Sequence, residues 1–239
     1  MKSTMQFFNV QFVAVYERNK NVRERIFEYE KALKSHFKNP FRSHSIPDDV
    51  DPNYPRFDAE SGYESLSVNQ ERLTYSNNIK GLNESIKIRE IVSKRINILK
   101  TLLLKEKISF IAYIIELHNI LENENDIFRL FKEGTQAKPL DLENLKEFSI
   151  FYAKPHKNEF FLNINCARYE QHTVKIQRDE IPSEENKKSG ISIVIDLNTR
   201  YLFNKKQPFY PELFNELENE TFEIISKNEL KNYLSGEIL

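Results

Sequence analysis

A short run in the second half of the chain, residues 166–172, holds side chains that can act as nucleophiles, acids or bases. Successive side chains of a β-strand alternate between its two sides, so every second residue of this run would share one face. These residues are Cys166, Arg168, Glu170 and His172. On such a face Glu170 could orient His172 as a general base while Arg168 holds an anionic ligand. The pattern therefore raises the hypothesis of an enzyme with an inward-facing polar pocket.

The same run also has a structural interpretation. Either the chain turns near Tyr169 and these side chains meet water, or Arg168 and Glu170 form an ordinary cross-strand pair worth roughly a few tenths of a kcal/mol. Cys166 continues an apolar row of the same face, and buried free cysteines usually behave as small hydrophobic side chains. We favour this interpretation, so the sequence predicts no catalytic residue.

A second oxygen-rich run, residues 49–60, spaces its carboxylate and amide oxygens like a Ca²⁺-binding EF-hand loop. The sharp turn of such a loop needs glycine at the sixth position, where this chain has Tyr54 followed by Pro55. We therefore expect a solvated acidic loop and no metal site. His118 and His156 have no partner at metal-ligand spacing, which predicts a turn or surface role for each. The five glycines do not form a Gly-rich phosphate loop, so no cofactor is expected.

Charge is segregated along the chain although the whole is nearly neutral, with a net charge of −1. Residues 17–42 have eight Lys or Arg against four Glu, and residues 43–71 have one Arg against seven Asp or Glu. Such segregation fits a basic helix that binds nucleic acid through Lys31, Lys34 and Lys38, or a charge-complementary dimer contact. It also fits a solvated helix face, which is the commoner case, so nucleic-acid binding is not favoured.

The composition is typical of a soluble globular protein. Of 239 residues, 39% are hydrophobic and 12% are aromatic, which is too much aromatic mass for a disordered chain. No continuous apolar stretch predicts a membrane span, and the single cysteine excludes a disulfide framework. The first residues lack the apolar core of a secretory signal, so we expect a cytoplasmic protein with no membrane partner.

The apolar residues of the first half alternate between strand and helix periodicity. Period-two alternation predicts a strand from Phe8 to Tyr16, and apolar spacings of three and four predict a helix from Val22 to Phe37 that Pro40 ends. The next predicted elements are hairpin strands at 63–68 and 72–77, a helix at 84–105 interrupted by Arg95, and a strand at 108–117. This order is the split βαβ pattern of ferredoxin-like folds, with helices on one face of an antiparallel sheet.

The second half again combines strands with helices. A short helix at 126–132 precedes Gly134 and Pro139, which place a connector at 133–146. The predicted elements that follow are strands at 148–153, 159–167, 173–178 and 191–197, a flexible connection at 182–190, a helix at 211–225, and a last helix opened by a capping box at 226–229 and closed by Gly236. The fold class is therefore α+β with two sheet-plus-helix halves, residues 1–132 and 147–239.

Four segments together carry a resemblance to a known family. They are the strand and helix from Phe8 to Phe37, the meander from Tyr54 to Asn77, the strand Phe110-Ile111-Ala112-Tyr113-Ile114 after its helix, and the strand Ile193-Val194-Ile195-Asp196 with the helices that follow it. In this patterning the chain resembles a sporadically distributed, uncharacterised bacterial family whose members have two α+β halves. The resemblance implies an accessory of mobile-element or defence loci, and it carries over no catalytic residue.

The sequence thus favours a non-catalytic interaction or regulatory protein that binds a protein partner or forms a homo-oligomer. Large sheets with many aromatic residues and no catalytic motif suit recognition. The alternatives are the enzyme around Arg168, Glu170 and His172, and the nucleic-acid binder that uses the helix within residues 18–42. A buried polar pocket would favour the enzyme and a continuous basic stripe the nucleic-acid binder. An exposed apolar or edge-strand surface would favour the interaction protein.

Overall fold

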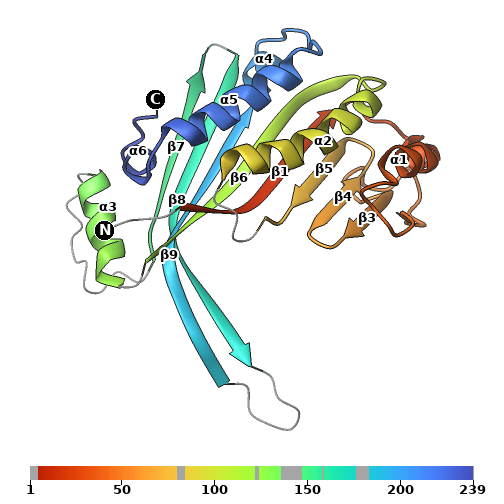
Figure 1. Cartoon of the computed structure of the whole chain (residues 1–239). Helices are drawn as coiled ribbons and strands as arrows, with labels where there is room; N and C mark the ends of the chain where they lie inside the picture. The colour runs from red at the N-terminus through yellow and green to blue at the C-terminus, as the bar shows by residue number, and fades with distance from the viewer. Residues whose placement is uncertain are drawn as a thin grey trace.

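All strands of the described chain belong to one antiparallel sheet, in the order β2-β3-β4-β5-β1-β6-β9-β8-β7 (Figure 1). The computed structural model describes residues 5–79, 84–121, 124–135, 147–157, 159–175 and 183–238. The strands are β1 (Met5–Tyr16), β2 (Arg42–Ser43), β3 (Phe57–Ser61), β4 (Glu64–Val68), β5 (Arg72–Asn77), β6 (Ile108–Leu121), β7 (Ser149–His156), β8 (Phe160–Lys175) and β9 (Ser183–Asn198). The helices are α1 (Ile26–Leu33), α2 (Ser85–Leu103), α3 (Glu124–Thr135), α4 (Arg200–Asn204), α5 (Leu213–Lys227) and α6 (Leu230–Ser235). The prediction of an α+β fold is confirmed.

Helices α2 and α5 lie over one face of the sheet, and the core forms beneath them (Figure 1). The buried ring of Phe12 in β1 contacts Tyr113 of β6 and Phe214 of α5 at centroid distances of 5.3 and 6.0 Å. Side chains on the other face of these strands, such as Gln11 and Ile114, are only partly buried. Antiparallel sheets commonly bury one face in this way. No helix within the described ranges is both long enough and apolar enough to cross a membrane.

Arg95, which interrupts the apolar stripe of α2, has a specific partner. Ile88, Val92 and Leu99 of the stripe are fully buried. Arg95 donates from Nε to Oε2 of Glu64 in β4 at 3.2 Å and from Nη2 to Oε1 at 2.8 Å, and the two side chains expose only 18% and 14% of their surface. A bidentate ion pair satisfies both groups and fixes their geometry, so it holds α2 against β4.

The predicted elements of the first half are present in the predicted sequence order, with one helix shorter than predicted and with two strands, β2 and β3, that were not predicted. A 3₁₀ turn at Val22–Arg25 leads into α1, which ends at Leu33 rather than near Phe37. Phe37 is nevertheless buried, because residues that follow the helix also pack into the core. The two predicted hairpin strands are confirmed as β4 and β5, and β3 pairs with the other side of β4.

One ladder joins the two predicted halves. Residues 112–121 of β6 pair with residues 189–198 of β9, so strands from both sides of the connector form a continuous sheet. The division into two sheet-plus-helix halves is therefore not confirmed. Helix α3 extends to Thr135, into the predicted connector at 133–146, and residues 136–146 lie outside the described ranges.

Two predictions for the β8–β9 hairpin are wrong. Residues 159–167 and 173–178, predicted as separate strands, belong in their described part to β8, which continues to Lys175 with an irregularity at Thr173 and Val174. The predicted flexible connection at 182–190 lies largely in β9. The side chains there are polar, but a backbone ladder needs no apolar side chains. The outer part of this hairpin projects from the sheet as a two-stranded ribbon (Figure 1).

The end of the chain differs from the prediction in the short helix α4, which was not predicted, and at the start of the last helix. The capping box is formed by Glu229 and Asn232, which exchange hydrogen bonds between side chain and backbone, rather than by residues 226–229. Gly236 closes the helix in the left-handed conformation, with a φ of 75°. Glycine adopts this conformation without the steric cost of a Cβ, so the predicted helix end is confirmed.

The ladder between β6 and β9 predicts a sensitive position at Gly190. A Cβ there would clash with the backbone carbonyl oxygen of Asn119 and lie 2.9 Å from the ring of Tyr169. We expect Gly190→Ala to lower the free energy of unfolding by about 1–3 kcal/mol, as overpacking does in well-packed proteins. Ser192→Ala, two residues further along β9, is the matched control and should change it by less than about 0.5 kcal/mol. Equal denaturation midpoints for both variants would contradict the tight contact.

Candidate functional site

The Arg168–Glu170 pair lies where the sheet narrows to the ribbon. β7 accompanies β8 only as far as Ala167, so both residues stand beyond the last registered pair of that ladder. The side chain of Arg168 exposes 9% of its surface and forms an ion pair with Glu170, which exposes 27%. Arg168 and Glu170 do pair, but within one strand, so the predicted cross-strand pair is wrong. β8 also continues through Tyr169, so the predicted alternative of a turn there is wrong as well. The charge of Arg168 is therefore balanced locally by Glu170.

His172 is placed by its backbone alone. It lies in β8 and pairs with Lys187 of β9, out on the ribbon. Its side chain lies outside the described residues. The contact between Glu170 and His172 on which the enzyme hypothesis depends therefore stays a prediction.

Cys166 lies in the middle of the core rather than at a reactive surface. Its side chain is fully buried, and its neighbours across the ladders are Ile150 of β7 and Ile193 of β9. Burial raises the pKa of the thiol to about 12. Because the thiolate is the nucleophilic form, this cysteine is an apolar packing residue, as the structural interpretation predicted.

The two histidines predicted to lie in turns or at the surface both have specific side-chain partners. His118 exposes 9% of its surface and stacks between Phe8 and Tyr169, each at a centroid distance of 4.2 Å. Its Nε2 lies 2.7 Å from Oε1 of Glu116, two residues back on the same strand. The prediction of a surface role for His118 is therefore wrong.

His156 ends β7 directly beside the β7–β8 turn, and its side chain reaches a helix. Its Nε2 lies 2.6 Å from Oε1 of Glu220 in α5, and Lys157 contacts the other carboxylate oxygen at 2.5 Å. Glu220 is buried, so the two nitrogens supply the partners that a buried carboxylate requires. This cluster fastens the β7–β8 turn to α5. Sequence spacing could not reveal it, since the partners are more than sixty residues apart.

The acidic run at 49–60 does not gather its oxygens around a cation. Asp51 accepts hydrogen bonds from the backbone and the side chain of Asn53, at 2.9 and 3.0 Å, and Asp58 pairs with Arg42 and His44. No cluster of His, Cys, Asp or Glu in the described residues is arranged to hold a metal ion.

A buried arginine organises this same loop. The side chain of Arg56 has no exposed surface. Its Nη1 donates to the carbonyl of Tyr54 at 2.7 Å, and its Nη2 lies 3.3 Å from the carbonyl of Pro47 and 3.4 Å from that of Asp51. A guanidinium with its fork of donors can satisfy several carbonyl oxygens at once, so Arg56 holds the proline-rich loop closed.

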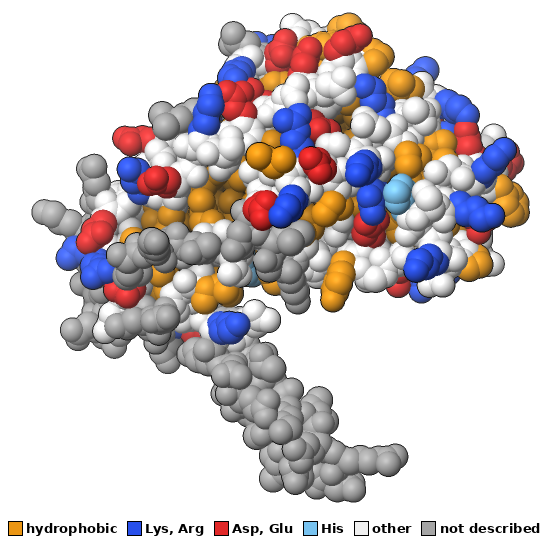
Figure 2. Space-filling model, in the orientation of Figure 1, with side chains coloured by type: hydrophobic (Ala, Val, Ile, Leu, Met, Phe, Trp, Pro, Cys, Tyr) orange, Lys and Arg blue, Asp and Glu red, His pale blue; other side chains and the backbone are white. Residues whose placement is uncertain are grey.

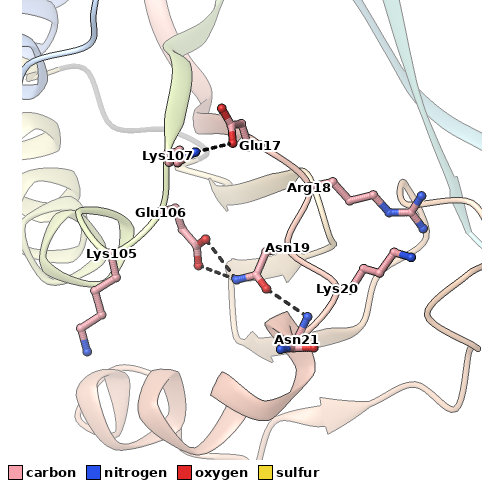
Figure 3. A pocket seen from close by; sticks show the side chains of 8 residues that line it. All are labelled: Glu17, Arg18, Asn19, Lys20, Asn21, Lys105, Glu106 and Lys107. Carbon is pink, nitrogen blue, oxygen red and sulfur yellow. Dashed lines mark hydrogen bonds and ion pairs between the residues drawn. The ribbon is translucent and has the colours of Figure 1, made fainter.

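An open pocket of about 440 Å³ lies beside the start of the basic segment (Figure 3). It is lined by Glu17, Arg18, Asn19, Lys20, Asn21, Lys105, Glu106 and Lys107. Lys107 pairs with Glu17 at 3.1 Å, and Lys105 pairs with Glu28. Among the described residues, Lys20 is the one cation of this pocket that has no partner. Ion pairs therefore neutralise part of the positive charge in this pocket, which does not form a concentrated anion-binding site.

Folding neutralises much of the charge that the sequence segregates. Arg23 of the basic segment pairs with Asp48 of the acidic one at 3.4 Å, and Arg42 pairs with Asp58. Three lysines remain exposed, with no carboxylate partner in the described part of the chain: Lys31, Lys34 and Lys38. Figure 2 shows positive and negative side chains interspersed over the face that carries α2 and α5.

The outer edge of β7 is the surface that sequence reasoning missed. β7 ends the sheet and has β8 as its one neighbour strand in the described residues. The N–H of Arg168 donates to the carbonyl of Phe148 at 3.2 Å, so these two residues form a hydrogen-bonded pair. Hydrogen-bonded and non-hydrogen-bonded pairs alternate along an antiparallel ladder, so this one bond assigns all the other pairs between β7 and β8. Even-numbered residues of β7 therefore bond to β8, and odd-numbered ones direct their backbone groups outward. These outward residues are Ser149, Phe151, Ala153 and Pro155.

The side chains at these outward positions are exposed and uncharged. Phe151 exposes 64% of its surface, and Ser149 and Ala153 are exposed beside it. Natural edge strands are commonly protected by charged residues, above all lysine. The one lysine of β7, Lys154, instead points to the helix-covered side and donates to the carbonyl of Gly236 at 3.2 Å. Pro155 could have signalled the edge, since proline within a sheet is confined to positions whose N–H is not needed.

No protein-family model matches this chain, and no curated protein matches it either.

The buried thiol gives a direct test of this geometry. Cys166 is the only cysteine of the chain, so labelling with an alkylating reagent reports on it alone. At pH 8 we expect the folded protein to resist iodoacetamide, because burial and the raised pKa keep the thiol protonated and inaccessible. Protein unfolded in guanidinium should react to completion. Rapid stoichiometric labelling of the folded protein, measured by mass spectrometry, would show that Cys166 is reactive after all.

Proposed function

We propose that the protein is a non-catalytic interaction or regulatory protein, which binds a protein partner by addition of a strand to the outer edge of β7. The observation that carries this proposal is the row of outward backbone groups at Ser149, Phe151 and Ala153, flanked by uncharged side chains. Main-chain hydrogen bonds supply affinity in strand addition, and exposed side chains such as Phe151 supply specificity.

The ion-pair geometry of the described residues also favours recognition over catalysis. Arg168 pairs with Glu170, and the thiol of Cys166 is buried. The enzyme hypothesis needs these groups to be available to a substrate. It therefore ranks below the interaction protein.

The proposal includes a finer description of the fold. The neighbours β4, β5, β1 and β6, with a helix after β1 and another after β5, support a ferredoxin-like split βαβ unit. The resemblance described above supports a bacterial, cytoplasmic accessory of mobile-element or defence loci.

The runner-up is a nucleic-acid contact, favoured by the exposed Lys31, Lys34 and Lys38, which have no carboxylate partner among the described residues. Basic side chains that neutralise phosphates give binding that weakens steeply with salt.

A site-specific cross-linker tests the proposed function. With a photoreactive phenylalanine analogue in place of Phe151, irradiation of the cells that produce the protein should yield a discrete cross-linked species containing this chain. The same analogue at Tyr63, which is 76% exposed on another part of the molecule, is the matched control and should yield none. Ala153→Pro, combined with the analogue at position 151, should abolish the product, since it removes an outward N–H that strand addition uses. No product at position 151, or a product indifferent to Ala153→Pro, would refute strand addition at β7.

Fluorescence anisotropy with labelled single-stranded and duplex oligonucleotides tests the runner-up. We expect no binding at physiological salt. Micromolar affinity with a log–log salt slope of several units would reverse the ranking, provided that Lys31→Glu, Lys34→Glu and Lys38→Glu together abolish it. The control carries the same change of charge at three other exposed lysines: Lys94→Glu, Lys188→Glu and Lys206→Glu.

A further inference from the structure

We propose that the partner at β7 is a second copy of this chain, so that two sheets join edge to edge about a two-fold axis. This inference rests on the proposed function, because it uses the same outer edge. It adds the identity of the partner and the register of the pairing.

The hydrogen-bonding groups of the edge complement themselves. In an antiparallel ladder, outward residues of one strand face outward residues of the next, and each facing pair exchanges two hydrogen bonds. If Phe151 faces Phe151 of the second copy, Ser149 faces Ala153 at each end. Every outward N–H from 149 to 153 then meets an outward C=O, so no donor in this stretch is left without a partner.

The side chains are compatible with the same register. Ser149 and Ala153 are small, so they flank the exposed Phe151 rings without crowding them. Facing aromatic residues are among the cross-strand pairs that stabilise sheets, while like charges that face each other destabilise them. No residue from 149 to 153 is charged, so the two copies bring no repulsion into the ladder.

Pro155 limits the pairing to this stretch. It occupies the next outward position but has no N–H to donate. A register shifted by two residues toward Pro155 would pair it directly and leave an acceptor of the other copy without its donor. The centred register, with Phe151 facing Phe151, therefore keeps more hydrogen bonds than this shifted one.

The second copy is favoured over an unrelated strand because one sequence supplies both sides of the match. An isologous contact needs a surface that complements itself under two-fold rotation. The outer edge of β7, paired with Phe151 facing Phe151, meets this condition in its donors, its acceptors, its side-chain sizes and its lack of charge.

Sedimentation velocity of the purified full chain tests the proposal. Over a series from about 1 to about 500 µM, the range in which small interfaces assemble, we expect a reversible shift from monomer to dimer. Ala153→Pro should weaken the association at least about tenfold. Each copy loses the N–H of residue 153, which donates to the carbonyl of Ser149 in the other copy. Ala153→Thr keeps the N–H and should leave the association within about threefold of the unchanged chain.

The fold of Ala153→Pro must be checked, and the strand itself suggests that it is tolerated. Pro155 already stands at an equivalent outward position, and the N–H of residue 153 is not used by β8. A thermal midpoint close to that of Ala153→Thr confirms folding. If Ala153→Pro does not fold, Phe151→Asp gives the same test, because the two-fold axis places the new carboxylate opposite itself.

A charge-pairing experiment tests the register. Ser149→Lys combined with Ala153→Glu places opposite charges across the interface and should dimerise at least as well as the unchanged chain. Ser149→Lys combined with Ala153→Lys places like charges there and should weaken dimerisation at least about tenfold. Equal association of the two double variants would overturn the centred register.

Sedimentation and cross-linking together distinguish a failure of the dimer from a failure of the proposed function. A chain that stays monomeric to the highest concentration overturns the second copy as partner. If the Phe151 cross-link then still forms with a protein of different mass and still depends on the N–H of Ala153, strand addition at β7 survives with another partner. If the cross-link is also absent, both proposals fail.

Discussion

The hydrogen-bonded ladder between β6 and β9 is the interaction on which the rest of the structure depends. It pairs residues 112–121 with residues 189–198 and thereby makes one sheet from strands that are far apart in the sequence. It also brings α2 and α5 together above the sheet. There Glu218 of α5 accepts a hydrogen bond from Ser93 at 2.7 Å and pairs with Arg89 at 3.2 Å. Burial, and then the charge of Glu218, raises the pKa of Tyr113, which keeps its hydroxyl protonated as a donor to that carboxylate.

A single antiparallel sheet leaves two edges, and the two are unlike in this protein. The β2 edge is two residues long and carries Arg42, whose charge pairs with Asp58 and Glu60. The β7 edge is eight residues long and presents an uncharged outer side. Charge and shortness are the usual means by which a sheet avoids unwanted pairing. The first edge uses both of them, and the second uses only Pro155 near its end.

Apolar periodicity predicted the parts of the fold in which side-chain burial follows the backbone repeat. The stripe Ile88, Val92 and Leu99 predicted α2, and the alternation in 63–68 and 72–77 predicted β4 and β5. It failed on the outer β8–β9 hairpin, where backbone hydrogen bonds hold polar residues in strands. It also could not find Arg56 or the Glu220 cluster, because their partners are loop carbonyls or residues distant in the sequence. The continuous sheet was missed for the same reason, since pairing between β6 and β9 is a long-range choice.

The buried charged groups of the loop around Arg56 and of the β7–β8 turn have their main partners within the molecule, and this bears on where its function lies. Glu220 is held by His156 and Lys157, and Arg56 by the carbonyls of its own loop. A catalytic site keeps at least one such group available to a substrate, often with a shifted pKa and an adjacent cavity. The outward groups on β7 are of another kind: backbone donors and acceptors in a regular row, beside an exposed aromatic ring. Groups of this kind can hydrogen-bond to another extended strand, and the proposed function rests on that capacity.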